Sequence, residues 1–228
     1  MQMHASWLQT IEMDNCDNFN GLGILKLLQL CKSLQTLRAP TVRLEFFLDD
    51  YDLQQEWGCR KTLNNLSLSI ECSVERERQI CASLENQASA NQGAVPEIAP
   101  APAISPYLVR QRQLFDRIAT LTSLRVLDLT CSEKGTNLEF SLSTGLDRLW
   151  TLTHLRHLDL RTRKERIGHR EQPMSRVLRV LTSEEARWMA NEWPDLKSIS
   201  GLVQTQELDA KLKEFVTTLT LLRPDVRV

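Results

Sequence analysis

The chain has 228 residues, of which 42% are hydrophobic, and a formal net charge of −1. This composition is sufficient for one large domain or two small ones with an apolar core, and the charge excludes a strong overall attraction to nucleic acid or to an anionic membrane. No apolar run approaches the roughly 18 residues of a membrane-spanning helix, and the first ten residues lack the basic and apolar regions of a secretory leader. We therefore expect a protein of the cytoplasm or nucleus whose six cysteines are reduced thiols.

Three segments near the N-terminus follow the pattern Leu-x-x-Leu-x-Leu or a variant of it. They begin at Leu8, Leu34 and Leu63, and each predicts a short strand whose first, fourth and sixth residues point to the core. The first segment adds a cysteine, Cys16, where a buried Asn or Cys commonly bonds the backbone of the following turn. A helix is expected over 20–31, between the first two strands.

Residues 86–106 interrupt this series, because 61 residues (124 − 63 = 61) separate Leu63 from the first leucine of the next segment. They hold four of the eight prolines and almost no large apolar side chains. Burial would not offset the entropy lost on ordering such a segment, so we expect a disordered insertion. The long interval leaves two possibilities open, an insertion or a degenerate repeat. A helix is then expected over about 106–120, with Leu114, Phe115 and Ile118 on its apolar face.

The clearest repeat lies within 118–160. The segment LTSLRVLDL is followed by LTHLRHLDL, and aligning Leu124 with Leu155 gives a period of 31 residues (155 − 124 = 31). Such a unit cannot bury its apolar face alone and must stack on copies of itself. The pattern predicts an α/β fold, a leucine-rich-repeat solenoid of about six irregular repeats that forms one domain over 1–228.

The C-terminal quarter predicts two more helices and a degenerate sixth strand that begins at Leu196. Thr182 and Glu185 form a capping box at the start of a helix that carries Trp188 and Trp193. Residues 205–228 predict a capping helix and tail, whose apolar stripe consists of Leu208, Leu212, Phe215, Leu219 and Leu222. We expect this stripe to cover the end of the solenoid, and the two tryptophans to fill the seam beneath it.

The phrases LTSLRVLDL, FSLSTGLDRLWTLTHLRHLDL and EEARWMANEWPDLKSISGL resemble the C-terminal repeats of fungal F-box/leucine-rich-repeat proteins, within the ribonuclease-inhibitor-like superfamily. The resemblance covers most of 118–203, and 8–70 only through the generic repeat. It implies parallel strands on a concave face, helices on a convex face, and the substrate-binding role of a ubiquitin-ligase receptor. We find no F-box in this sequence, so a Skp-type adaptor is an expected partner only if an F-box lies upstream. The alternative is a free-standing scaffold or GTPase-regulating repeat protein with no ubiquitin role.

Polar residues between the inward leucines predict a protein-binding face. The third, fifth and seventh residues of each strand pattern should face solvent on the concave side. The candidate binding residues are Glu12, Arg38, Asp128, His157, Asp159 and Arg161. Arg161 is a seventh-position residue. Pro40 and Ser69 are the seventh-position residues of the second and third segments, so we expect them to face solvent as well. An ordinary solvated sheet face accounts for the same pattern, so both interpretations stay open.

Asp128, His157 and Asp159 are also the residue types of an acid–base or metal site. No nucleophile, glycine-rich phosphate loop or metal motif accompanies them, so we expect no enzymatic activity, no cofactor and no metal. Residues 161–179 contain seven basic and two acidic side chains, and 44–56 contain five acidic and no basic ones. The basic connector would attract an acidic or phosphorylated ligand, or it is simply solvated. Nucleic acid is not expected, because no aromatic residues are interleaved with the arginines.

Overall fold

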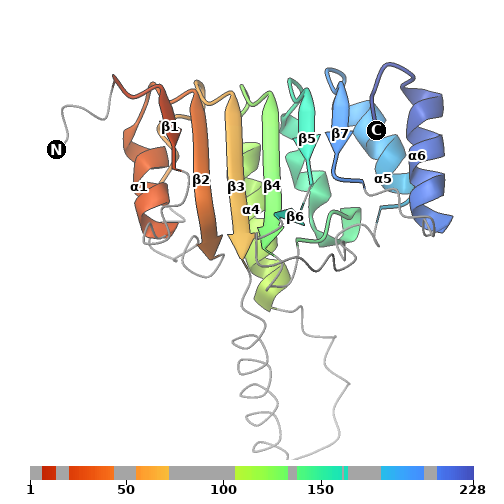
Figure 1. Ribbon diagram of the computed structural model, residues 1–228, viewed down its shortest axis with the longest axis horizontal. Coiled ribbons are helices and arrows are strands. Elements are labelled where there is room, and N and C mark those ends of the chain that lie inside the picture. Colours follow the sequence, from red (N-terminus) through yellow and green to blue (C-terminus); the bar gives the residue numbers. More distant parts are fainter. Residues whose placement is uncertain are drawn as a thin grey trace, which may run out of the picture.

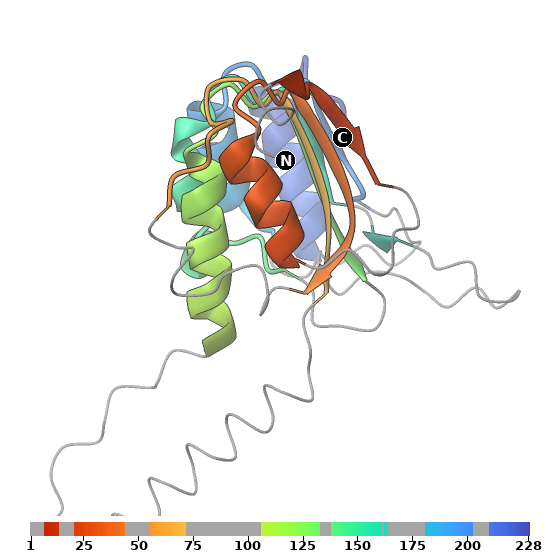
Figure 2. The ribbon, with the colours of Figure 1, turned by 90° about the vertical axis from the view of Figure 1, so that its left-hand side faces the viewer.

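The computed structural model describes residues 7–13, 21–43, 55–71, 106–132, 138–160, 162–163, 181–202 and 210–228. Within these ranges the chain is an α/β protein in which a parallel sheet carries helices on one face (Figures 1 and 2). None of the described helices has the length and apolar character needed to cross a bilayer. The predicted α/β class is therefore correct for the described part of the chain.

The sheet is built from strands that follow one another in chain order. They are β1 (Thr10–Glu12), β2 (Thr36–Arg43), β3 (Asn65–Glu71), β4 (Val126–Ser132), β5 (His157–Asp159) and β7 (Ser198–Ser200), with the short β6 (Thr162–Arg163) pairing with the end of β4. Each of these strands is parallel to its neighbour. Because β3 pairs directly with β4, the 61-residue interval between their segments is an insertion, and no strand of the sheet lies between them.

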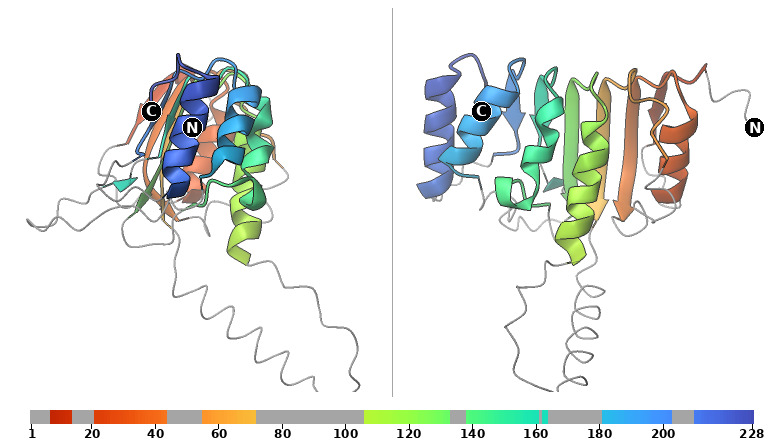
Figure 3. Two further views of the ribbon diagram at one scale, coloured as in Figure 1. Left: turned by 90° about the vertical axis from the view of Figure 1, so that its right-hand side faces the viewer. Right: turned by 180° about the vertical axis from the view of Figure 1, so that it is seen from behind.

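The helices lie behind the strands and are brought to the front when the molecule is viewed from behind (Figure 3). They are α1 (Gly21–Leu30), α4 (Pro106–Ala119), α5 (Ser183–Glu192) and α6 (Ala210–Leu222), together with the 3₁₀ helices η3 (Leu142–Thr144) and η4 (Leu146–Thr151). Parallel strands need such crossover connections, and here the crossovers all return on the same side. The opposite face of the sheet is therefore left open in the described part of the chain.

Leucines at the first, fourth and sixth positions of the repeat form the core between sheet and helices. From the second segment onward every such residue except Gly201, which is partly exposed, is at most 6% exposed, in the set Leu34, Leu37, Ala39, Leu63, Leu66, Leu68, Leu124, Leu127, Leu129, Leu155, Leu158, Leu160, Leu196 and Ile199. Full burial of one such side chain contributes roughly 1.5–3 kcal/mol. The fold is thus held by the same leucines that define the sequence pattern.

The first segment departs from this rule. Leu8 is 41% exposed, and Ile11 and Met13 are only partly buried. Among the described strands, β1 lies at the edge of the sheet and pairs with β2 alone, so its apolar residues lack packing from a strand on the outer side. The prediction that Leu8 points into the core is wrong.

A bulge in β2 alters the seventh positions. Ala39 pairs with Leu68 and Thr41 with Ser69, so Pro40 is the extra residue. Proline has no N–H to donate to a sheet ladder and is accommodated at bulges. Ser69 is also only 3% exposed, so the predicted pairing of Pro40 with Ser69 on a solvent-facing column is wrong.

Helix α4 matches its expected apolar face, with Leu114, Phe115 and Ile118 fully buried. An unexpected member of that face is Gln111, which is also buried. Its amide nitrogen donates to the Glu139 carbonyl at 2.7 Å, and its amide oxygen accepts the Glu139 backbone N–H at 3.0 Å. The paired bonds satisfy a polar side chain in the core and attach α4 to the connector that precedes β5.

The C-terminal helix closes the last strand unit. α6 packs against α5 through Leu212, Phe215 and Leu219, which are buried, whereas Leu222 at its final turn is 47% exposed. Leu222 therefore does not belong to the covering stripe, and Leu208 lies outside the described residues. The tail then pairs along the edge of β7, where the Ile199 amide donates to the carbonyl of Arg227 at 2.9 Å.

The capping box predicted at Thr182 and Glu185 is confirmed. The Thr182 amide donates to Glu185 Oε2 at 2.9 Å, and the Glu184 amide donates to the Thr182 hydroxyl at 3.2 Å. Trp193 is fully buried and contacts the partly buried Trp188 edge-on, with ring centroids 5.1 Å apart. Its indole N–H donates to the Leu149 carbonyl at 3.1 Å, so the ring also joins α5 to η4 of the preceding unit.

Other predictions fall outside the described residues. These are the insertion over 86–105, the turn at Cys16, most of the acidic segment 44–56, and most of the basic connector 161–179.

Candidate binding face

The strand register assembles two rows of side chains on the open face of the sheet, the face toward the viewer in Figure 1. The third-position row is Thr10, Thr36, Asn65, Val126, His157 and Ser198. The fifth-position row is Glu12, Arg38, Ser67, Asp128, Asp159 and Ser200. Neighbours within a row stand about 4.8 Å apart, the ordinary separation of paired strands. Residues from the two ends of the chain thus share one surface.

Strand alternation explains why these rows are polar and accessible. Leu127 of β4 and Leu158 of β5 turn inward and are at most 1% exposed, so the residues on either side of each must turn outward. His157 is exposed, and Asp128 and Asp159 are partly exposed. These side chains are not needed to fill the core, which leaves them available for contacts with another molecule.

Cross-strand hydrogen bonds order both rows. The Asn65 amide donates to the Thr36 hydroxyl at 3.1 Å, and the Ser67 hydroxyl donates to Asp128 Oδ2 at 2.7 Å. Further along, His157 Nδ1 and the Ser198 hydroxyl are 2.8 Å apart. Such pairs are the local unit of sheet stabilisation, and they hold the polar groups in defined positions before any ligand arrives.

Charge is distributed unevenly along the fifth-position row. Glu12 and Arg38 are register neighbours at the N-terminal end, whereas Asp128 and Asp159 are neighbours in the C-terminal half. The two aspartates place two carboxylates side by side, and His157 is two residues before Asp159 on the same strand. The face therefore presents an acidic patch bordered by a histidine.

Five of the six candidate binding residues are brought together on this face: Glu12, Arg38, Asp128, His157 and Asp159. The sixth, Arg161, lies outside the described residues. Thr162 and Arg163 follow it in β6 and pair with the end of β4, beyond the two rows. Whether the connector contributes to the face stays a prediction.

The arrangement around His157 is weak as a catalytic group. Its described hydrogen-bond partner is the Ser198 hydroxyl, and its register partner on β4 is Val126. A histidine–carboxylate pair among the described residues, His154 with Asp195 at 3.3 Å, involves different side chains and belongs to the turns before β5 and β7. Within the described residues no group of three or more His, Cys, Asp or Glu side chains is arranged to hold a metal ion.

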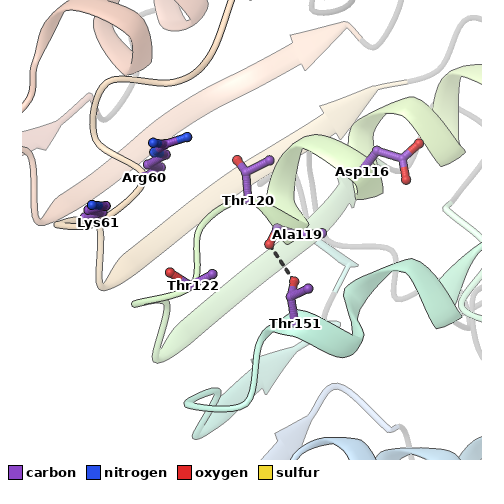
Figure 4. Close-up of a pocket in the computed structure, with 7 residues that line it drawn as sticks. All are labelled: Arg60, Lys61, Asp116, Ala119, Thr120, Thr122 and Thr151. Atoms are coloured by element: carbon purple, nitrogen blue, oxygen red, sulfur yellow. Dashed lines mark hydrogen bonds between the residues drawn. The ribbon is translucent and has the colours of Figure 1, made fainter.

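A cleft of about 470 Å³ lies on the helix side, where the chain turns into β3, β4 and β5 (Figure 4). It is lined by Arg60, Lys61, Asp116, Ala119, Thr120, Thr122 and Thr151. Thr151 donates to the Ala119 carbonyl at 2.5 Å, and Asp116 is paired with Arg148. Because these polar groups already bond to the protein, we interpret the cleft as a seam between successive units and not as a ligand site.

Two described cysteines also have structural roles. Cys31 and Cys59 are fully buried free thiols, and burial raises the pKa of both, that of Cys59 to about 12. Such thiols stay protonated at neutral pH and are poor nucleophiles and metal ligands.

The sequence reasoning missed a row of basic residues at the second position of the pattern. Arg125, Arg156 and Lys197 each follow the first leucine of their segment. We call these three residues the basic row. Its signal is visible in the letters L-R-V-L, L-R-H-L and L-K-S-I, where the residue after the first leucine is basic each time.

Comparisons of the chain with models of known protein families, with curated proteins and with solved structures find no match. The function must therefore be inferred from the chemistry of the open face and of its rim.

Proposed function

We propose that this chain is a leucine-rich-repeat solenoid that binds another protein through the open face of its sheet. Three features support the proposal. The Leu-x-x-Leu-x-Leu segments lie in register on neighbouring strands, one period apart for Leu127 and Leu158. The leucines form the core. Every described crossover returns on the same side of the sheet.

The observation that carries the proposal is the fifth-position row. Its side chains are polar, ordered and not required by the core, and they come from strands far apart in sequence. Repeat folds of this kind offer an extended surface of this type for binding macromolecules. Substitutions in this row can change the binding partner without disturbing the packing of the leucines.

Binding is favoured over catalysis on chemical grounds. Catalysis by acid and base needs groups whose geometry converges on one reacting atom, whereas a row of residues 4.8 Å apart, the ordinary strand spacing, is spread along a line. A line of polar and charged side chains is suited to an extended protein surface or peptide. We therefore assign no reaction to this chain.

The resemblance to fungal F-box/leucine-rich-repeat proteins suggests the biological setting. In it, this chain supplies the substrate-binding repeats of a ubiquitin-ligase receptor, and a Skp-type adaptor binds a separate F-box module. The rival setting is a free-standing scaffold or GTPase regulator. Affinity purification of the full gene product distinguishes them: recovery of a Skp-type adaptor supports the receptor, and recovery of partners without an adaptor favours the scaffold.

The direct test is the double variant Asp128→Arg/Asp159→Arg, used as bait for partner capture from the native source. Reversing two adjacent charges deletes contacts and adds repulsion, so the partners recovered with the wild type should be lost. The matched control is Asp147→Arg/Glu214→Arg, which makes the same charge change at two exposed sites on the helix side. Both proteins are first checked by thermal unfolding. If the Asp128/Asp159 variant captures the same partners as the control, the open face is not the binding surface.

A further inference from the structure

The residues of the basic row are joined to one another by backbone hydrogen bonds. The Arg156 amide donates to the Arg125 carbonyl at 2.8 Å, and the Lys197 amide donates to the Arg156 carbonyl at 2.8 Å. Each hydrogen bond fixes the next residue one strand along the sheet. Three cationic residues therefore stand in line along the rim where the strands begin. Arg227 is in register with Ser198, a third-position residue, and does not belong to this row.

All three side chains of the row are exposed. In the described part of the chain, no carboxylate pairs with Arg125 or Arg156. Other arginines behave differently: Arg148 is bound to Asp116 and Arg223 to Asp225. Like charges at directly neighbouring strand positions repel, so Arg125 and Arg156 cost the fold some stability without a compensating carboxylate among the described residues.

Two acidic side chains lie near the row, and each is already engaged. Asp195 pairs with His154 at 3.3 Å, and Asp225 accepts from Lys197 at 3.1 Å and from Arg223 at 3.0 Å. The pairing with Asp225 reduces the free charge at Lys197. Arg125 and Arg156 are therefore the centre of the unneutralised positive charge.

We propose that the basic row binds an extended acidic segment of a partner protein, one with acidic side chains at alternate positions. This surface is separate from the two rows of the open face and goes beyond the protein binding proposed for them. Three strands spaced about 4.8 Å apart give a row about 10 Å long. In an extended peptide, every second side chain is on the same face and about 6.8 Å from the last, so two successive acidic residues on that face fit within this length.

The chemistry favours a carboxylate-bearing peptide over single-stranded nucleic acid. Surfaces that bind single strands without sequence preference combine basic residues with aromatic side chains on which bases stack. The basic row contains no aromatic residue, and the side chains next to Arg125 and Arg156 on the strands are Val126 and His157. Guanidinium groups pair with carboxylates through two parallel hydrogen bonds, which provides both affinity and geometry.

The test uses a fluorescent peptide in which Glu and Ser alternate, and a counterpart in which Gln replaces every Glu. Fluorescence anisotropy with the intact chain at low ionic strength measures both affinities. The Glu peptide should bind at least about tenfold more tightly, and its affinity should fall as salt rises, because the interaction is between exposed charges. Equal affinity for the two peptides overturns the proposal.

Variants locate the binding. Arg125→Glu/Arg156→Glu should lower the affinity for the Glu peptide by about tenfold or more, since two favourable charges become repulsive. Arg125→Gln/Arg156→Gln should give a smaller loss without reversing charge, which guards against a folding artefact. The control, Lys26→Glu/Arg187→Glu, changes the net charge equally at exposed sites on α1 and α5 and should bind as the wild type does. Equal losses in the control and the row variant overturn the assignment of the site.

A thymidine oligonucleotide tests whether the basic row binds nucleic acid in preference to an acidic peptide. If it binds more tightly than the Glu peptide and loses affinity in Arg125→Glu/Arg156→Glu, the row is a nucleic-acid surface and the proposed partner is wrong. The Asp128→Arg/Asp159→Arg variant retains the basic row and should still bind the Glu peptide. Failure of this proposal therefore leaves the open-face proposal untouched, and the reverse also holds.

Discussion

The Ser67 hydroxyl donates a 2.7 Å hydrogen bond to Asp128 Oδ2, although 61 residues separate the two along the chain. Direct pairing of β3 with β4 brings them together across the long insertion. The bond aims one of the two carboxylates of the acidic patch, so an ordinary serine on one strand controls the geometry of a candidate binding residue on the next. Orientation of this kind lowers the entropy lost when a partner binds.

Replacing Ser67 with Ala should therefore affect both stability and binding. A hydrogen bond to a charged acceptor contributes roughly 1.5–3 kcal/mol when buried, and for this partly exposed pair we expect a loss of about 1 kcal/mol in the free energy of unfolding. Urea denaturation measures it. Ser200→Ala, in the same row but exposed, is the control and should change stability by less than about 0.5 kcal/mol. Equal effects of the two substitutions would show that the Ser67 bond does not order Asp128.

The inner strands and their register could be predicted from sequence because one rule determines both. A leucine at the first, fourth and sixth position must be buried, and alternation then fixes which residues face solvent. Aligning Leu124 with Leu155 predicts the pairing of Asp128 with Asp159, and the structure has that register. Five of the six candidate residues lie on one face for this reason.

The other features of the fold and of the candidate site depend on effects that the leucine pattern does not encode. Leu8 obeys the pattern but precedes the edge strand β1, where no described element packs on the outer side, and it is exposed. The bulge at Pro40 shifts the register of β2 by one residue, so that Thr41, and not Pro40, pairs with Ser69. Gln111 is buried because a backbone segment 28 residues away happens to satisfy its amide. The basic row escaped notice because second-position residues lie at the rim, outside the alternation that organises the face.

The capping role of α6 can be tested by placing a charge at its buried face. Phe215 is fully buried, whereas Leu221 on the same helix is 81% exposed. Phe215→Asp should cost roughly 3 kcal/mol or more, because it leaves a cavity and buries a carboxylate without a partner. Leu221→Asp is the matched control and should leave the thermal midpoint nearly unchanged. Unchanged unfolding of Phe215→Asp would contradict the packing of α6 over the last unit.

Arg223 connects the end of α6 to the turn before β7. Its guanidinium donates to the carbonyls of Trp193 at 3.2 Å, Pro194 at 2.9 Å and Leu196 at 3.1 Å. Arg223→Ala removes these bonds together and should lower the free energy of unfolding by about 2 kcal/mol. Arg223→Lys should recover only part of the loss, because an ammonium cannot reproduce the fork that reaches several carbonyls at once. A fully stable Ala variant would mean that the hydrophobic packing of α6 alone holds this end closed.

The ion pairs at Asp225 predict a specific dependence of stability on pH. Hydrogen bonds from Arg223, and then from Lys197, hold the pKa of the Asp225 carboxyl well below its ordinary value of 3.8. In the unfolded chain the carboxyl takes up a proton at a higher pH than in the folded chain. Its contribution is therefore fully present above the unfolded pKa and is lost as the pH falls toward the folded pKa.

Asp225 is 46% exposed, so this contribution is small and solvent-screened, and it must be separated from other acidic groups. Comparing the wild type with Asp225→Asn subtracts the effects common to both proteins. Urea unfolding at neutral pH should find the wild type more stable, and the difference should shrink as the pH is lowered through about 4, the range in which an unperturbed aspartate titrates. Added salt at neutral pH should reduce the difference as well. A difference that stays constant from neutral to acid pH would show that the side chain acts through neutral hydrogen bonding or packing, and that its charge does not stabilise the end of the sheet.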